Sequence, residues 1–156
     1  MNESVVIVDR SSIHEGKLDA VRDEMKELAE FAQANEPRMI AYSAYLNKDR
    51  SQVTVFQMHP DSASAEFHMQ VGVPLFQKFV DLLKLQQIDV YGEAGAGLIE
   101  QLQHKADMLG GAPLAISARR VCSTGLEGSE DAGAGHQAMR HHSMRDGRLH
   151  LSQESS

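Results

Sequence analysis

Two histidines that lie close together in the sequence are the side chains best suited to proton chemistry. His59 and His68 are nine positions apart, the first after a β-branched run and the second inside an expected helix. An unperturbed imidazole titrates near ~6.5, so His68 is able to accept or release a proton at neutral pH. Beside this functional interpretation stands a structural one, in which His68 makes a hydrogen bond in the core next to Phe67. The residue types leave both interpretations open.

A glutamine and a tyrosine are expected beside His59. If the hairpin over residues 39–58 closes at its central polar loop, Gln57 and Tyr42 lie on the same sheet face as His59. We predict that these three side chains, together with Phe67, bind a substrate. In the alternative interpretation Gln57 makes only a hydrogen bond, and His59 does no more than begin a turn.

A metal site is a weaker interpretation of the same residues. The side chains with ligand chemistry in this segment are His59, Asp61, Glu66 and His68. Glu66 and His68 point to different sides of the expected helix, so they do not converge on one ion. Four more histidines, His136, His141, His142 and His150, follow near the C-terminus, where nothing fixes the geometry that zinc requires. We therefore predict no metal site.

The elements that must position these side chains follow a β-α-β-β-α-β order. Strands are indicated by β-branched and alternating runs, and helices by apolar residues every three or four positions. The expected strands cover residues 4–8, 39–46, 53–58 and 87–92, and the expected helical stretches cover 18–36, 61–71 and 75–83. Gly72-Val73-Pro74 divides the last two stretches. This order predicts an α+β, ferredoxin-like fold with an antiparallel sheet.

A further amphipathic pattern follows the last of these strands. Its stripe consists of Leu98, Leu102, Ala106 and Leu109, and the pair Gly110-Gly111 with Pro113 ends it. We expect a short C-terminal helix here, with a short edge strand over residues 114–116. The predicted organisation is a domain over residues 1–92, a helix and strand that pack on it over 93–116, and a disordered tail over 117–156.

Composition supports this division and excludes several classes of protein. The chain has 156 residues and a formal charge of -7, which argues against general nucleic-acid binding and against anionic membranes. All its aromatic residues precede position 117, and the remaining residues show no sustained apolar period. A single cysteine, Cys122, fits a reducing compartment. No apolar run is long enough to span a bilayer, and no basic segment precedes an apolar one at the start. We expect a cytoplasmic protein.

The hairpin strands predict a partner for the sheet. Closure at Lys48-Asp49 gives two sheet faces, and both of them are largely apolar. The helices of this topology cover only one face, whereas an antiparallel sheet with one wet face alternates apolar and polar residues. We therefore expect a homodimer, a small-molecule ligand, or both to cover the second face.

The order of elements and the segment 53–68 resemble the antibiotic biosynthesis monooxygenase superfamily, whose members are dimeric α+β barrels. Its pattern is an apolar third strand, then Glu-x-aromatic, a polar turn, and a helix that carries histidine nine residues after the aromatic. His68 falls on the helix histidine. Gln57 replaces the acidic residue that is common in the family, and His59 replaces the aromatic one. The resemblance covers roughly residues 4–92.

The resemblance implies a monooxygenase without a cofactor that acts on an aromatic, quinol or polyketide-like small molecule. His68 would be the general base, because a phenol or hydroquinone must lose a proton before its anion supplies electrons to oxygen. The alternative is a non-catalytic barrel that binds a small molecule or is purely structural. Haem binding or degradation ranks lower, since the chain has no tryptophan of the kind that familiar haem-degrading relatives use.

Overall fold

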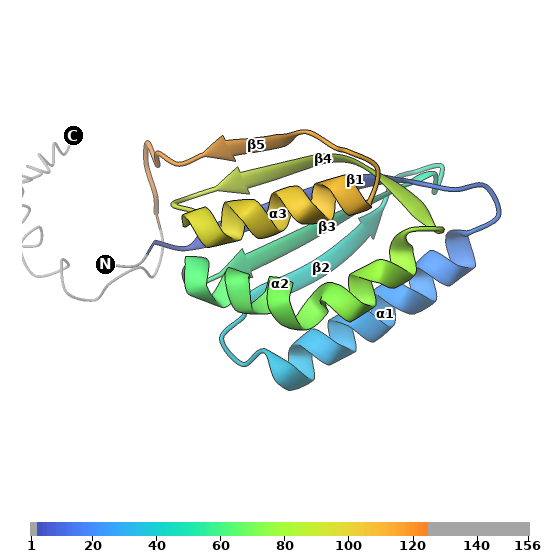
Figure 1. The fold of residues 1–156 in the computed structure, drawn as a ribbon, viewed down its shortest axis with the longest axis horizontal. Helices are drawn as coiled ribbons and strands as arrows, with labels where there is room; N and C mark the ends of the chain where they lie inside the picture. Colours follow the sequence, from blue (N-terminus) through green and yellow to red (C-terminus); the bar gives the residue numbers. More distant parts are fainter. Residues whose placement is uncertain (1–2, 125–156) are drawn as a thin grey trace, which may run out of the picture. The chain divides into compact units, whose positions relative to one another are not determined.

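A computed structural model describes residues 3–124 of the chain (Figure 1). Most of the predicted tail, from residue 125 onward, lies outside the described residues. The elements are β1 (Val5–Ile13), α1 (Leu18–Asn35), β2 (Ala41–Leu46), β3 (Gln52–His59), α2 (Ser62–Phe76), a 3₁₀ turn (Gln77–Phe79), β4 (Leu83–Tyr91), α3 (Ala96–Met108) and β5 (Leu114–Ser117). The predicted α+β, ferredoxin-like fold is confirmed.

The strands form a single sheet in the order β2-β3-β1-β4-β5. The first four are antiparallel neighbours, as the split arrangement requires, and β5 adds a parallel strand beside β4. All three α-helices lie on one side of this sheet (Figure 1). The expected C-terminal helix and edge strand are confirmed as α3 and β5.

The hairpin of β2 and β3 has a register two residues away from the predicted one. Tyr42 pairs with Gln57, and the centre of the loop falls at Asp49-Arg50. The Asn47 side chain holds this turn by accepting from the backbone N–H of Gln52 at 2.9 Å. Because side chains alternate with a period of two, a shift of two residues leaves every side chain on its predicted face.

Near the second helix, two predicted boundaries are wrong. α2 runs without a break through Gly72-Val73-Pro74, and β4 begins at Leu83 instead of Gln87. Met69, Gly72 and Phe76 are buried at helical spacing, so core packing holds together a stretch that local propensity would divide. Gly72 leaves room for the Phe76 ring, since a Cβ atom at position 72 would lie 2.4 Å from Cζ of Phe76 and the ring would have to shift.

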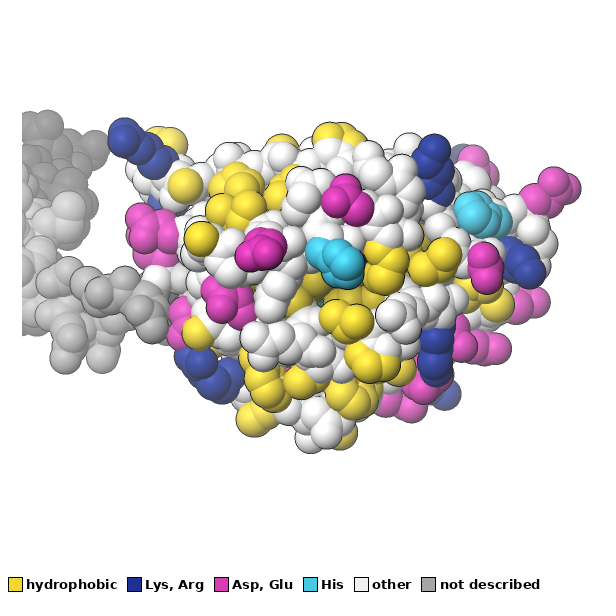
Figure 2. All heavy atoms as spheres, viewed as in Figure 1, with side chains coloured by type: hydrophobic (Ala, Val, Ile, Leu, Met, Phe, Trp, Pro, Cys, Tyr) yellow, Lys and Arg dark blue, Asp and Glu magenta, His cyan; other side chains and the backbone are white. Residues whose placement is uncertain are grey.

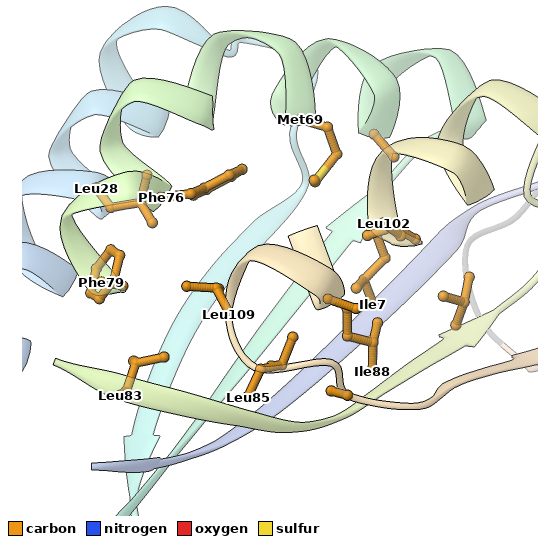
Figure 3. Packing of buried hydrophobic residues seen from close by; sticks show 14 of the residues in the cluster. Ile7, Leu28, Met69, Phe76, Phe79, Leu83, Leu85, Ile88, Leu102 and Leu109 are labelled. Carbon is orange, nitrogen blue, oxygen red and sulfur yellow. The ribbon is translucent and has the colours of Figure 1, made fainter. Parts of the chain in front are cut away.

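The core lies between the sheet and the helices, as Figure 3 shows from close by. Phe76 and Phe79 reach into it from the end of α2 and the following turn, and Ile7, Leu85 and Ile88 rise from the sheet. β1 is longer than predicted: it continues past Val8 to Ile13. The alternation of β1 therefore carries Asp9 and Ser11 onto the same buried face as Val5 and Ile7.

The other face of the sheet carries no helix among the described residues. In register across β3, β1 and β4 it presents Met58 beside Val6 and Phe56 beside Val8, with Tyr91 on the far side of Val6. These residues are only partly buried in the monomer, and Tyr91 is 48% exposed. We name Val6, Val8, Phe56, Met58 and Tyr91 the open-face patch. Across residues 3–124, no helix combines the length and the apolar character needed to cross a bilayer.

Candidate functional site

Four predicted polar residues meet in the layer between the sheet and the helices. Gln57 and His59 point there from β3, Tyr42 from β2, and His68 from α2. Gln57, His59 and His68 are 1% exposed or less. α2 is held at its start by Asp61, whose carboxylate accepts from the backbone N–H of Ser64 at 2.8 Å. This cap fixes the turn of helix that carries His68 toward the sheet.

His68 is held by a carboxylate that the sequence analysis did not single out. Its Nδ1 lies 2.9 Å and 3.0 Å from the two oxygens of Glu36, the residue just after α1. Glu36 is itself buried, with 5% exposure. A carboxylate at this distance accepts the Nδ1 hydrogen and so selects the tautomer whose Nε2 carries a lone pair.

The Nε2 atom of His68 is buried and has no hydrogen-bond partner among the described residues. The ring lies among other rings, with centroid distances of 5.9 Å to Tyr42, 5.6 Å to Phe76 and 5.5 Å to His59. A buried acceptor without a donor costs free energy, so the site favours a ligand or water that donates a hydrogen there. The arrangement is that of an oriented imidazole base.

His59 has a different electrostatic environment from His68. Burial and, to a smaller extent, the neighbouring His68 lower the pKa of His59 to about 4 against the opposing effect of Asp61. The ring is therefore neutral at pH 7. Its nitrogens lie 3.4 Å from Oγ of Ser64 and 3.4 Å from Oε1 of Gln57, which are long contacts. Because its ring is neutral, His59 can donate one hydrogen bond and accept another at pH 7.

Tyr42 faces the same layer as a neutral phenol. Burial raises the pKa of Tyr42 well above its ordinary value of 10, and the negative charges of Asp9 and Glu36 raise it further. The hydroxyl therefore keeps its proton throughout the neutral range and serves as a hydrogen-bond donor.

A buried ion pair lies farther along the same layer. Lys105 of α3 donates through Nζ to Oδ2 of Asp9, and both side chains are less than one-tenth exposed. The same Nζ lies 4.9 Å from the centroid of the Phe76 ring. The other carboxylate oxygen of Asp9, Oδ1, is buried without a partner among the described residues. Phe76 thus contacts the imidazole of His68 on one side and the cation of Lys105 on the other.

Among residues 3–124, three hollows border this layer. An inner cavity of about 30 Å³, with room for roughly two water molecules, has Asp9, Ser11, Tyr42, Phe76 and Lys105 in its lining. A groove of about 320 Å³ between α2 and α3 is also lined by Phe76 and Lys105. Figure 2 shows hydrophobic side chains gathered on the face of the molecule that carries these helices.

The third hollow lies between α1 and β2. It has a volume of about 420 Å³, and Gln33, Glu36 and Tyr42 are in its lining. The buried layer is therefore flanked by two grooves, one that reaches Glu36 and Tyr42 and one that reaches Phe76 and Lys105.

The structure separates one predicted residue from the others. Phe67 is 45% exposed on the outward side of α2, away from the buried layer that holds Tyr42, Gln57, His59 and His68. No group of three or more His, Cys, Asp or Glu side chains within residues 3–124 is arranged to hold a metal ion.

Three residues of the layer were missed by the sequence analysis, and two of them had a detectable signal. Asp9 continues the alternation of Val5 and Ile7, and Lys105 stands three positions after Leu102 on the apolar stripe of α3. Both are charged residues at positions whose period indicates burial. Glu36 had no such signal, because it follows the end of a helix.

Comparison with solved structures supports the fold. MupZ from Pseudomonas fluorescens aligns with a TM-score of 0.62 at 15% identity, over 79% of this chain and 95% of MupZ. SnoaB from Streptomyces nogalater, a cofactor-independent oxygenase, aligns with a TM-score of 0.52 at 13% identity, over 60% of this chain and 96% of SnoaB. Rv0793 from Mycobacterium tuberculosis aligns with a TM-score of 0.53 at 13% identity, over 60% of this chain and 97% of Rv0793.

No family model and no curated protein matches the sequence. At these identities the neighbours establish the architecture alone. The chain shares the α+β fold of these three solved structures, and this fold is the one that the resemblance carried by residues 53–68 implies.

Proposed function

We propose that the chain is a cofactor-independent monooxygenase that acts on an aromatic, quinol or polyketide-like small molecule, with His68 as the general base. The observation that carries the proposal is the pairing of His68 with Glu36, which leaves Nε2 buried and free to accept a proton. The surrounding rings of Tyr42, His59 and Phe76 suit a planar ligand.

The reaction can be written for an activated methylene flanked by a phenol or carbonyl group. His68 takes one proton, and the substrate anion transfers electrons to dioxygen as a carbon–oxygen bond forms. The resulting peroxide receives the proton back and loses water, which leaves a carbonyl group. Carbon is oxidised by four electrons and dioxygen is reduced by four, with one oxygen atom in the product and the other in water. The protein supplies the base, the orientation and a dry site.

Each remaining polar residue has a role in this scheme. Glu36 orients the His68 ring and stabilises the imidazolium that forms when the proton arrives. Gln57, neutral His59 and the Tyr42 hydroxyl supply hydrogen bonds that hold the substrate oxygen atoms. In the proposal Phe67 does not contact the substrate.

The test is oxygen uptake by purified variants against a panel of hydroquinones and anthrones. His68→Ala should lower turnover roughly 10²–10⁴-fold, the usual contribution of a general base, with little loss of binding. Gln57→Ala and His59→Ala should change affinity more than rate, and exposed His14→Ala serves as the matched control. A folded His68→Ala protein with the turnover of the parent would contradict the assignment.

A second candidate function is a barrel that binds a small molecule without chemistry. The small size of the inner cavity and the complete burial of His68 favour it, because no reactant reaches Nε2 unless a neighbouring side chain moves. In that case His68→Ala should lower stability by about 1–3 kcal/mol through a lost hydrogen bond and a small void. No member of the panel should then support oxygen uptake.

We also propose that the protein is a homodimer that joins two sheets through their open-face patches. An apolar patch on a sheet face that no helix covers is typical of a protein–protein contact. Light scattering should give twice the chain mass of 17.2 kDa at micromolar concentration. Phe56→Lys, within the patch, should shift the mass to that of the monomer, whereas Tyr45→Lys at the sheet edge should have a smaller effect. A parent protein that is monomeric would refute the dimer.

A further inference from the structure

Phe76 occupies the boundary between two hollows of the molecule. Its ring lines both the inner cavity and the groove between α2 and α3, and Lys105 lines both as well. Figure 3 shows the Phe76 side chain within the layer between helix and sheet. If this one ring moves aside, the groove and the inner cavity become continuous. The ring of His68, which lines neither hollow, has its centroid 5.6 Å from that of Phe76.

The Asp9–Lys105 pair lines the inner end of this joined space, and packing alone does not account for it. Replacing a buried ion pair by apolar side chains is often neutral or stabilising, so such a pair is weak evidence for a stabilising role. Here the pair is also incomplete, because Oδ1 of Asp9 lacks a donor. Asp9, Ser11, Tyr42 and Lys105 bring acceptors and donors to one end of a cavity whose other walls are apolar. This is the composition of a site that orients one polar group of an otherwise apolar ligand.

We propose that Phe76 is a displaceable side chain that closes a ligand site open to the groove between α2 and α3, and that the Asp9–Lys105 pair binds a hydroxyl group of the ligand. The ligand class is a small planar aromatic that carries a hydroxyl group. Its ring takes the place of the Phe76 ring beside the Lys105 cation, and its hydroxyl donates to Oδ1 of Asp9. The inference rests on the proposed function only in naming this ligand as the substrate of His68.

The size of the groove fits this ligand class. At about 320 Å³ it lies at the lower end of the volumes that bind drug-sized molecules, whereas the inner cavity alone holds only water. The groove between α1 and β2 is larger but reaches the layer at Glu36 and Tyr42. The Asp9–Lys105 pair places the polar end of the ligand on the α3 side, so the route between α2 and α3 is the one we infer.

The experiment measures binding of 2-naphthol and of naphthalene, which lacks the hydroxyl, to the full-length chain. Fluorescence of the ligands reports binding with no tryptophan emission beside it, since the protein has no tryptophan. The parent should prefer 2-naphthol by about tenfold or more, the usual effect of a hydrogen bond to a buried charged group. The double variant Asp9→Leu with Lys105→Met should bring the two affinities within about twofold. Equal affinities in the parent, or an unchanged preference in the double variant, would overturn the hydroxyl assignment.

Displacement of Phe76 is tested by truncation. Phe76→Ala, which has no ring to move, should bind 2-naphthol about tenfold more tightly than the parent. Phe67→Ala removes an exposed ring from the same helix and should leave the affinity unchanged. If Phe76→Ala does not fold, Phe76→Leu should give a smaller increase in the same direction. Unchanged or weaker binding by a folded Phe76 variant would overturn the displacement.

The entry route of the ligand is tested by placing a bulky side chain in each of the two grooves. Val73→Phe, in the groove between α2 and α3, should slow 2-naphthol association about tenfold, and Gln33→Phe, in the groove between α1 and β2, should not. The opposite result would place the route beside α1. These outcomes are read from the binding of 2-naphthol alone, so they do not depend on turnover. If no compound supports oxygen uptake but 2-naphthol binds as expected, the proposed function fails and the ligand site stands. If oxygen uptake is found but the binding results are the contrary ones, the ligand site fails and the proposed function stands.

Discussion

The buried His59 ring should make the protein lose stability in mild acid. Its pKa is about 4 in the folded state, against an ordinary value of 6.5 that applies to the unfolded chain. Below about pH 6.5 the unfolded state therefore binds more protons than the folded state, and stability falls as the pH falls toward 4. Linkage gives a loss of about 2 kcal/mol at pH 5 and about 3 kcal/mol at pH 4. Domains of this kind have a total stability of roughly 5–15 kcal/mol, so the loss is large.

The assay is urea unfolding of the parent and of His59→Gln between pH 7.5 and pH 4. Glutamine does not titrate and keeps a donor for Oε1 of Gln57, so the variant should lose about 3 kcal/mol less than the parent over this range. His104→Gln removes an exposed histidine from α3 and controls for the loss of any imidazole. The ring carbon shifts of His59 should also remain those of a neutral imidazole at pH 5. Parallel stability curves for the parent and His59→Gln would refute the reasoning.

Three further outcomes follow from the buried charges and from the packing of α2. Glu36→Gln should lower oxygen uptake by at least about tenfold, because a neutral amide stabilises the imidazolium of His68 poorly; a parental rate would contradict the orienting role. Lys105→Met alone should destabilise the protein by about 3–5 kcal/mol in urea unfolding, since it leaves the Asp9 carboxylate buried without its cation, and adding Asp9→Leu should recover most of that loss. Gly72→Ala should lower the melting temperature by several degrees, because the new methyl group collides with the phenylalanine ring one turn later; unchanged melting would show that this ring moves freely.

Much of the fold and part of the site follow from local patterns. Alternation in the hairpin was enough to place Tyr42, Gln57 and His59 on one face, even though the predicted register was two residues away. The sheet face on which a side chain lies depends only on whether its position in the strand is odd or even, whereas the pairing register depends on the turn. In this turn Arg50 adopts a left-handed conformation with φ of 60°, which its residue type does not favour. Sequence therefore predicted which residues share a surface better than which residues are paired.

The errors around the second helix have one physical cause. Gly72 and Pro74 disfavour helix locally, but Phe76 and Phe79 are each only 3% exposed, so continuous packing outweighs those costs. Propensity cannot report a contact that forms only when the chain is folded. The same limit explains Glu36, whose partner His68 stands 32 positions away and is brought to it by tertiary structure.

The parallel pairing of β5 with β4 has a consequence for the order in which the protein folds. Until Leu114–Ser117 docks, β4 is an edge strand with a free row of backbone hydrogen-bonding groups. These residues leave the ribosome after the other described strands, and α3 separates them from β4. The edge of the sheet in a growing chain is therefore unpaired for longer than it would be if β4 and β5 formed an antiparallel hairpin. β5 therefore shields the nearly complete sheet from pairing with a neighbouring chain during synthesis, and chains that end before residue 114 should aggregate while they are being made.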